Sequence, residues 1–152
     1  MRAKMGVDEL KKIFDLTGKV AVVTGGSGGA GKAISVGLAL YGADVVVTSR
    51  TLSTLEETAA EVEKVGKKAL PISCDVADQE SVNQMMARTV QEFGKVDILV
   101  TAAGIALRDP AEEMPIDNWQ QVMDANVKGT YLCCQAAARE ILGLKGIDKV
   151  KY

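Results

Sequence analysis

Residues 19–31 read Lys-Val-Ala-Val-Val-Thr-Gly-Gly-Ser-Gly-Gly-Ala-Gly, and this stretch decides the fold. Its first half, Val20 to Thr24, is a short apolar run rich in β-branched residues, which is typical of a strand buried on both faces. Its second half is a glycine cluster, and the segment from Lys32 to Tyr41 has apolar residues at helical spacing. The stretch therefore predicts a buried strand, a tight glycine-rich turn and a helix, in that order.

The alternation of strand and helix continues along the chain. Further buried strands are predicted at Asp44–Ser49, Ala69–Cys74 and Val96–Thr101. Further helices are predicted after a capping box at Ser53-Thr54-Leu55-Glu56, after a cap at Asp78, and from Asp117 or Asn118 toward Leu142. Pro71 favours a position near the sheet edge for the third strand. Strict alternation implies right-handed crossovers. The predicted fold class is α/β, a Rossmann-type doubly wound parallel sheet, incomplete with about four strands.

The three later helices each have an apolar side. The residues expected on these sides are Leu55, Ala59, Val62 and Val65; Val82, Met85, Met86, Val90 and Phe93; and Trp119, Val122, Met123, Val127, Leu132 and Ile141.

Composition narrows the class of protein. A chain of 152 residues, 47% apolar and 25% charged, fits one globular domain, with predicted boundaries at 1–18 (extension), 19–142 (domain) and 143–152 (tail). A net charge of −2 without a Lys/Arg cluster argues against a nucleic-acid partner. The sequence has neither the apolar stretch of a signal peptide nor the run of about 20 apolar residues that spans a membrane. We expect no membrane partner and a cytoplasmic location.

The cysteines do not suggest a metal site. Cys74, Cys133 and Cys134 lack metal-ligand spacing, and the sequence has no histidine. We expect buried free thiols and no bound metal.

The glycine cluster is the first candidate binding element. Glycines permit a tight turn and a close approach of backbone to phosphate, and the first N–H groups of the following helix favour an anion. The loop fits two registers, Gly26-x-Gly28-x-x-Gly31 and Gly25-x-x-x-Gly29-x-Gly31. The alternative is a purely structural turn, but the strand before and the helix after it favour a dinucleotide site. The candidate residues are Gly25, Ser27, Gly28, Gly29, Ala30 and Gly31.

The end of the second strand indicates which dinucleotide binds. An acidic residue there takes the ribose hydroxyls of NAD, whereas an arginine accommodates the 2′-phosphate of NADP. The sequence has Ser49 and Arg50 at this point and no carboxylate in Thr48–Thr51. NADP is therefore the expected cofactor and NAD the less favoured one. The alternative is that Arg50 is a solvated surface residue.

The motif Thr-Gly-x-x-x-Gly-x-Gly from Thr24 to Gly31 resembles the cofactor signature of the short-chain dehydrogenase/reductase family, and the resemblance extends from about Leu16 to Leu142. It implies that Asp75 and Val76 meet the adenine, although Asp75 is also a plausible turn residue. It implies that Ala102, Ala103 and Gly104, where the family has Asn-Asn-Ala-Gly, lie against the cofactor. It assigns Asn126 to the family's catalytic tetrad.

The resemblance also implies an NAD(P)-dependent oxidoreductase that acts on a small-molecule alcohol or carbonyl substrate. The family's serine and Tyr-x-x-x-Lys motif are missing, because Tyr41 and Tyr131 are followed four residues on by Val45 and Gln135, and Tyr152 is the last residue. Residues 143–152 lack the apolar run of a fifth strand, which predicts an open edge on the fourth. We expect a homo-oligomer and an inactive cofactor-binding half. The alternatives are a non-catalytic NADP(H)-binding module and a truncated product that pairs with a full-length relative.

Overall fold

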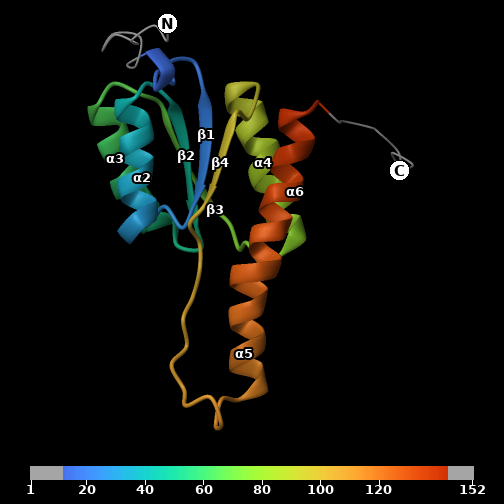
Figure 1. The fold of residues 1–152 in the computed structure, drawn as a ribbon. Helices are drawn as coiled ribbons and strands as arrows, with labels where there is room; N and C mark the ends of the chain where they lie inside the picture. The colour runs from blue at the N-terminus through green and yellow to red at the C-terminus, as the bar shows by residue number, and fades with distance from the viewer. Residues whose placement is uncertain (1–11, 144–152) are drawn as a thin grey trace, which may run out of the picture.

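A computed structural model describes residues 12–143, and the predicted tail lies almost entirely outside them. The described residues form a four-stranded parallel sheet in the order β3-β2-β1-β4, which confirms the predicted fold class. The strands are β1 (Val20–Thr24), β2 (Asp44–Ser49), β3 (Ala69–Ser73) and β4 (Ile98–Thr101). Figure 1 shows all four running in the same direction.

The two central strands carry the β-branched runs of the sequence. Val22 in β1 pairs in register with Val46 in β2, and both side chains are fully buried. Parallel strands buried on both faces are expected to be continuously apolar, as these are. Pro71 lies in β3 at one edge of the sheet, as its missing N–H predicted. In the described residues β4 forms the other edge. Ile98, Leu99 and Val100 are only partly buried, and Thr101 is exposed.

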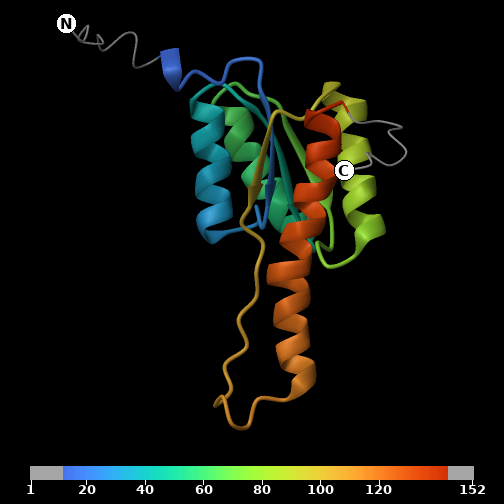
Figure 2. The same ribbon diagram turned by 45° about the vertical axis from the view of Figure 1, so that its right-hand side comes forward.

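Helices cover both faces of the sheet (Figures 1 and 2). One face packs against α2 (Gly29–Leu40) and α3 (Leu52–Lys64), and the other against α4 (Gln79–Phe93) and α6 (Gly129–Ile141). The first layer buries Val23, Val45, Val47, Leu55 and Val62, and the second buries Val22, Val46, Ile72, Met85 and Leu132. Between residues 12 and 143, the helices are all too short or too polar to cross a bilayer.

The ends of two helices test the predicted caps. Asp78 caps α4 as predicted, because its carboxylate accepts a hydrogen bond of 2.8 Å from the Ser81 N–H. The capping box at Ser53 is wrong. α3 already begins at Leu52, and Thr51, with an extended backbone, is the residue before it. Ser53 is therefore the second residue of the helix and lies inside its first turn, so it cannot be the residue that caps it.

The predicted last helix is longer and less regular than its apolar pattern suggests. It consists of α5 (Ile116–Met123), a π-helical turn (Asp124–Lys128) and α6. α5 extends beyond the carboxyl ends of the strands (Figure 1), and none of its residues is buried. The side chains of Trp119 and Val127 are therefore 46% and 55% exposed, whereas Leu132, beside the sheet, is 8% exposed. Of the predicted apolar side, only Leu132 is buried. Val122 and Met123 are half-buried, and the prediction is wrong for Ile141 at the end of α6, which is 47% exposed.

The predicted burial of other side chains is only partly confirmed. Cys74 and Cys133 are buried, but Cys134 is exposed because it lies on the outer side of α6. Val65, expected on the apolar side of α3, follows the last helical residue and is exposed. Leu55, Ala59 and Val62 are buried as predicted.

Candidate functional site

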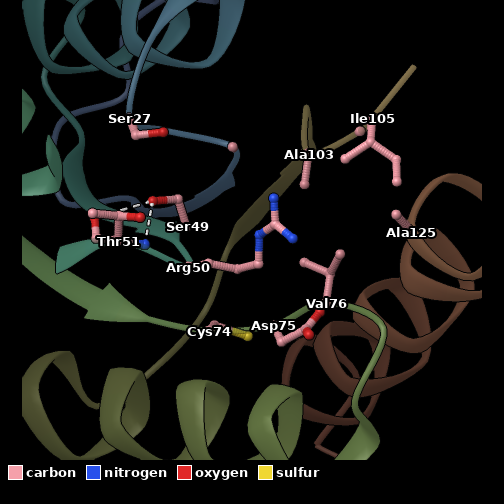
Figure 3. A pocket seen from close by; sticks show the side chains of 12 residues that line it. Ser27, Ser49, Arg50, Thr51, Cys74, Asp75, Val76, Ala103, Ile105 and Ala125 are labelled. Atoms are coloured by element: carbon pink, nitrogen blue, oxygen red, sulfur yellow. Dashed lines mark hydrogen bonds between the residues drawn. The ribbon is translucent and has the colours of Figure 1, made fainter. Parts of the chain in front are cut away.

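A pocket opens at the carboxyl ends of the strands, where β1 has β2 on one side and β4 on the other. In a doubly wound sheet this is the position at which ligands bind. The enclosed volume is about 200 Å³, smaller than the roughly 300–1,000 Å³ of typical ligand pockets, so a dinucleotide would extend out of it. Its lining consists of Gly25, Ser27, Ser49, Arg50, Thr51, Cys74, Asp75, Val76, Ala103, Gly104, Ile105 and Ala125 (Figure 3).

The glycine loop forms one wall because its backbone is closely packed against two other segments. Gly25 has a positive φ of 69°, and a Cβ added there would lie 2.6 Å from the carbonyl oxygen of Ala102. A Cβ on Gly31 would overlap the carbonyl oxygen of Gly25. Both positions require glycine, which brings β1, the loop after β4 and the start of α2 together.

The middle of the loop is held from outside. The Gly26 N–H donates to the Thr48 carbonyl at 3.0 Å, and the Gly26 carbonyl accepts from the Thr58 hydroxyl at 2.8 Å. Thr58 lies in α3 and is fully buried. The sequence analysis missed Thr58, because a threonine within a helix gives no signal of a contact 32 residues away.

The outer side of the loop is open. Gly28, Gly29 and Ala30 are exposed, and a Cβ on Gly28 or Gly29 would meet nothing within 4 Å. These residues lead into the first turn of α2, whose N–H groups have no partner within the helix. Such a turn with free space before it favours an anion such as a pyrophosphate. These three residues, Gly31, Ala102 and Asn126 lie outside the lining of the pocket itself.

The end of β2 brings a positive charge into the pocket. The Arg50 guanidinium extends into the open space in Figure 3. Its backbone is fixed because the Ser73 hydroxyl donates to the Arg50 carbonyl at 3.0 Å. The Ser49 hydroxyl accepts from the Thr51 N–H at 3.4 Å and donates to the Thr51 carbonyl at 3.3 Å, so it shapes the turn.

The opposite wall follows β3. Asp75 accepts a hydrogen bond of 2.9 Å from the Ala77 N–H, and its own N–H donates to the Ser81 hydroxyl at 3.0 Å. Asp75 is therefore a turn residue, which was the alternative to a cofactor contact, and it also lines the pocket. Cys74 beside it is buried, and this burial raises the pKa of its thiol, although the nearby hydroxyls of Ser81 and Thr48 act to lower it.

The loop after β4 is attached to β1 and to the last helix. The Ala103 N–H donates to the Thr24 hydroxyl at 3.2 Å, so a side chain at the end of β1 holds the loop after β4. Asn126, in the π-helical turn, accepts from the Ile105 N–H at 2.9 Å and donates to the Ile105 carbonyl at 3.0 Å. Its amide therefore holds the loop on which Gly104 lies.

Most of the lining residues were predicted from the sequence. These are Gly25, Ser27, Ser49, Arg50, Asp75, Val76, Ala103 and Gly104, whereas Thr51, Cys74, Ile105 and Ala125 were not predicted. Thr51 belongs to the same run of hydroxyl residues as Ser49 and could have been included. Ile105 and Ala125 gave no signal, because apolar residues of both sizes are also common in cores.

The chain is similar in sequence to known proteins. Residues 19–147 match the model of the family described as short chain dehydrogenase. The chain is 39% identical over 129 residues to a 2-dehydro-3-deoxy-D-gluconate 5-dehydrogenase of Dickeya dadantii, covering 85% of this chain and 50% of that protein. It is 36% identical over 128 residues to an L-rhamnose 1-dehydrogenase (NAD(P)(+)) of Sphingomonas sp., covering 84% and 50%.

A solved structure agrees with these sequence relatives. The crystal structure of a short-chain type dehydrogenase/reductase from Mycobacterium marinum superposes with a TM-score of 0.86 at 41% identity. The match covers 88% of this chain and 54% of that one. The chain thus spans about half the length of the relatives it matches.

Proposed function

This chain belongs to the short-chain dehydrogenase family, and on that premise we propose that it binds NADP(H) in the pocket at the carboxyl ends of its strands. It serves there as the cofactor-binding part of an oxidoreductase for alcohols and carbonyl compounds. The observation that carries the preference for NADP(H) is Arg50, whose guanidinium extends into the pocket from the end of β2. A guanidinium fork suits a phosphate, and β2 ends without a carboxylate that would take the ribose hydroxyls of NAD.

The residues present fit a dinucleotide. The close approach at Gly25 and Gly31 forms the cradle, and the open turn at Gly28 and Gly29 leaves space for the pyrophosphate. Asp75 and Val76 provide the wall for the adenine, and Ala102, Ala103 and Gly104 let the backbone approach the other end. When bound, the nicotinamide would supply the hydride.

The residues of this chain have separate tasks in that arrangement. Arg50 and the hydroxyls of Ser49 and Thr51 would select the 2′-phosphate. Asn126 would hold the Ile105 backbone, and through it the loop with Gly104, at a fixed distance from the helix. We also propose that Asn126 belongs to the family's catalytic tetrad.

Titration of the purified chain with NADPH and NADH by calorimetry tests the proposed cofactor. We expect saturable binding with NADPH preferred, and Arg50→Ala should weaken NADPH binding by on the order of 10- to 150-fold while leaving NADH nearly unchanged, since hydrogen bonds to charged groups contribute about 1.5–3 kcal/mol. Arg88→Ala is the matched control, because Arg88 is an exposed arginine of α4 outside the pocket lining. Equal losses for both cofactors in Arg50→Ala would refute the role of Arg50.

We also propose that these 152 residues do not complete the reaction alone. Proton transfer at the substrate oxygen needs a group of suitable pKa beside it, and the sequence has no Tyr-x-x-x-Lys motif. The expected result is cofactor binding without oxidation of NADPH in the presence of carbonyl compounds, followed at the nicotinamide absorbance. Turnover by the purified chain would contradict this proposal.

The names of the relatives support a small substrate. Two of them are dehydrogenases of a deoxygluconate derivative and of L-rhamnose, which are small hydroxylated molecules. We propose an alcohol or carbonyl compound of that size for the complete site. A homo-oligomer that covers the exposed Trp119 and Val127, and a cytoplasmic location, remain predictions, the first of which sedimentation would test.

A further inference from the structure

Thr58 makes a hydrogen bond that is unusual for a threonine within a helix. Such a hydroxyl commonly bonds the carbonyl four residues earlier in its own helix. Thr89 in α4 does this, since its hydroxyl donates to the Met85 carbonyl at 2.8 Å. Thr58 instead donates at 2.8 Å to the Gly26 carbonyl, which lies in the glycine loop outside α3. Both threonines are fully buried, and they differ in the group that accepts the hydrogen bond from the hydroxyl.

The bond from Thr58 completes the attachment of one residue of the loop, Gly26. The Gly26 N–H is bonded to the Thr48 carbonyl of β2 at 3.0 Å, and a Cβ at Gly26 would lie 3.1 Å from the Val47 Cβ. Gly26 is itself buried. The loop thus rests on β2 and is fixed to α3, the helix that begins just after Arg50 and Thr51.

We propose that Thr58 is a positioning residue for the cofactor: it holds the glycine loop at the distance from β2 and α3 that a dinucleotide needs. This inference rests on the proposed function of the pocket. Thr58 acts on the loop that would meet the pyrophosphate, which NADP(H) and NAD(H) share. It should therefore set the affinity for both cofactors, whereas Arg50 sets the preference between them.

The physical reason is preorganisation. Without the hydroxyl, the buried Gly26 carbonyl has lost a donor, and the loop can move to find another. Binding must then restore the loop to its working position, which lowers affinity without removing any group that contacts the ligand. From the net contribution of one hydrogen bond we expect binding about three- to tenfold weaker.

The test compares Thr58→Val, which keeps the shape and removes the hydroxyl, with Thr58→Ser, which keeps the hydroxyl. Thr89→Val is the matched control. Calorimetric titration should show NADPH and NADH weakened about three- to tenfold in Thr58→Val with their ratio unchanged, and near wild-type affinity in Thr58→Ser and Thr89→Val. Wild-type affinity in Thr58→Val, or equally weak binding in Thr58→Ser, would overturn the proposal.

A second measurement separates this inference from the proposed function. Amide hydrogen exchange without cofactor should be faster at Gly26, whose N–H is bonded to the Thr48 carbonyl, in Thr58→Val than in Thr89→Val. If the wild-type chain binds neither cofactor, the proposed function fails, but faster exchange still supports the attachment of the loop by Thr58. Unchanged exchange would refute that attachment directly.

Discussion

Replacing Gly31 by alanine would test whether the close approach between the glycine loop and α2 is needed for stability and binding. The added carbon would overlap the Gly25 carbonyl oxygen and lie 2.7 Å from the Gly25 carbonyl carbon, about 0.7 Å short of the 3.4 Å at which ordinary contact begins. Both partners are backbone, so neither can rotate away. Overpacking of this kind costs typically 1–3 kcal/mol, and we expect about 3 kcal/mol here. In a chain of this length that lowers Tm by roughly 6–12 °C.

Gly37→Ala on the same helix is the matched control. A Cβ there meets nothing within 4 Å, and alanine in a helix is more stable than glycine by about 0.5–1 kcal/mol, so Tm should rise slightly. Thermal melts of both variants, with NADPH titrations, make the comparison. Gly31→Ala should also bind NADPH at least about tenfold more weakly, because the cradle must open by a fraction of an ångström. A raised Tm and unchanged NADPH binding in Gly31→Ala would refute the reasoning.

Two further predictions concern titratable groups. Burial, with smaller effects of Cys74 and Cys134, raises the pKa of Cys133 to about 12. Iodoacetamide should therefore label the exposed Cys134 long before Cys133, as mass spectrometry would detect. The reverse order of labelling would contradict the described burial. For Asp97, partial burial raises the pKa, but hydrogen bonds from Lys95 and the Val20 N–H outweigh it and lower the pKa below its ordinary 3.8. The ionised Asp97 therefore stabilises the fold fully above pH 3.8, and this stabilisation is lost as the pH falls below it. The Tm difference between wild type and Asp97→Asn should shrink below pH 3.8. A Tm difference that does not change with pH would count against this role.

The central part of the fold was predictable because its signals are local. The β-branched runs predicted β1 and β2 with the bounds that the structure has, and Pro71 indicated an edge strand. The start of α3 was predicted too late. A capping box identifies side chains that are able to cap a helix, but it does not show at which residue the backbone changes from extended to helical. Thr51 decides that point by its backbone conformation.

The last helix shows a different limit. Periodicity gives the side of a helix that carries apolar residues, but it contains no information on what lies opposite. Trp119 and Leu132 both lie on the predicted apolar side, yet Leu132 is buried in the core against the sheet and Trp119 is exposed. The π-helical turn at Asp124–Lys128 changes the backbone hydrogen bonding by one residue and leaves no mark on composition.

The candidate site was predictable for residues whose type alone indicates their role. Arg50 could be identified by its charge, and the glycines by their lack of a side chain. The contacts that hold the loops could not, because Thr58 with Gly26 and Asn126 with Ile105 join residues 32 and 21 positions apart through backbone groups. Every residue has such groups, so only the fold selects which ones meet.

The contact between Thr24 and Ala103 has a thermodynamic consequence. It joins residues 79 positions apart, so one wall of the pocket exists only after β4 has paired beside β1. A cofactor that binds only the assembled pocket must then stabilise nearly the whole described chain by mass action, by about 2.7 kcal/mol when its concentration is 100 times Kd. Cofactor availability would thus determine how much of the chain is folded, and the ligand would behave as a structural component of the domain.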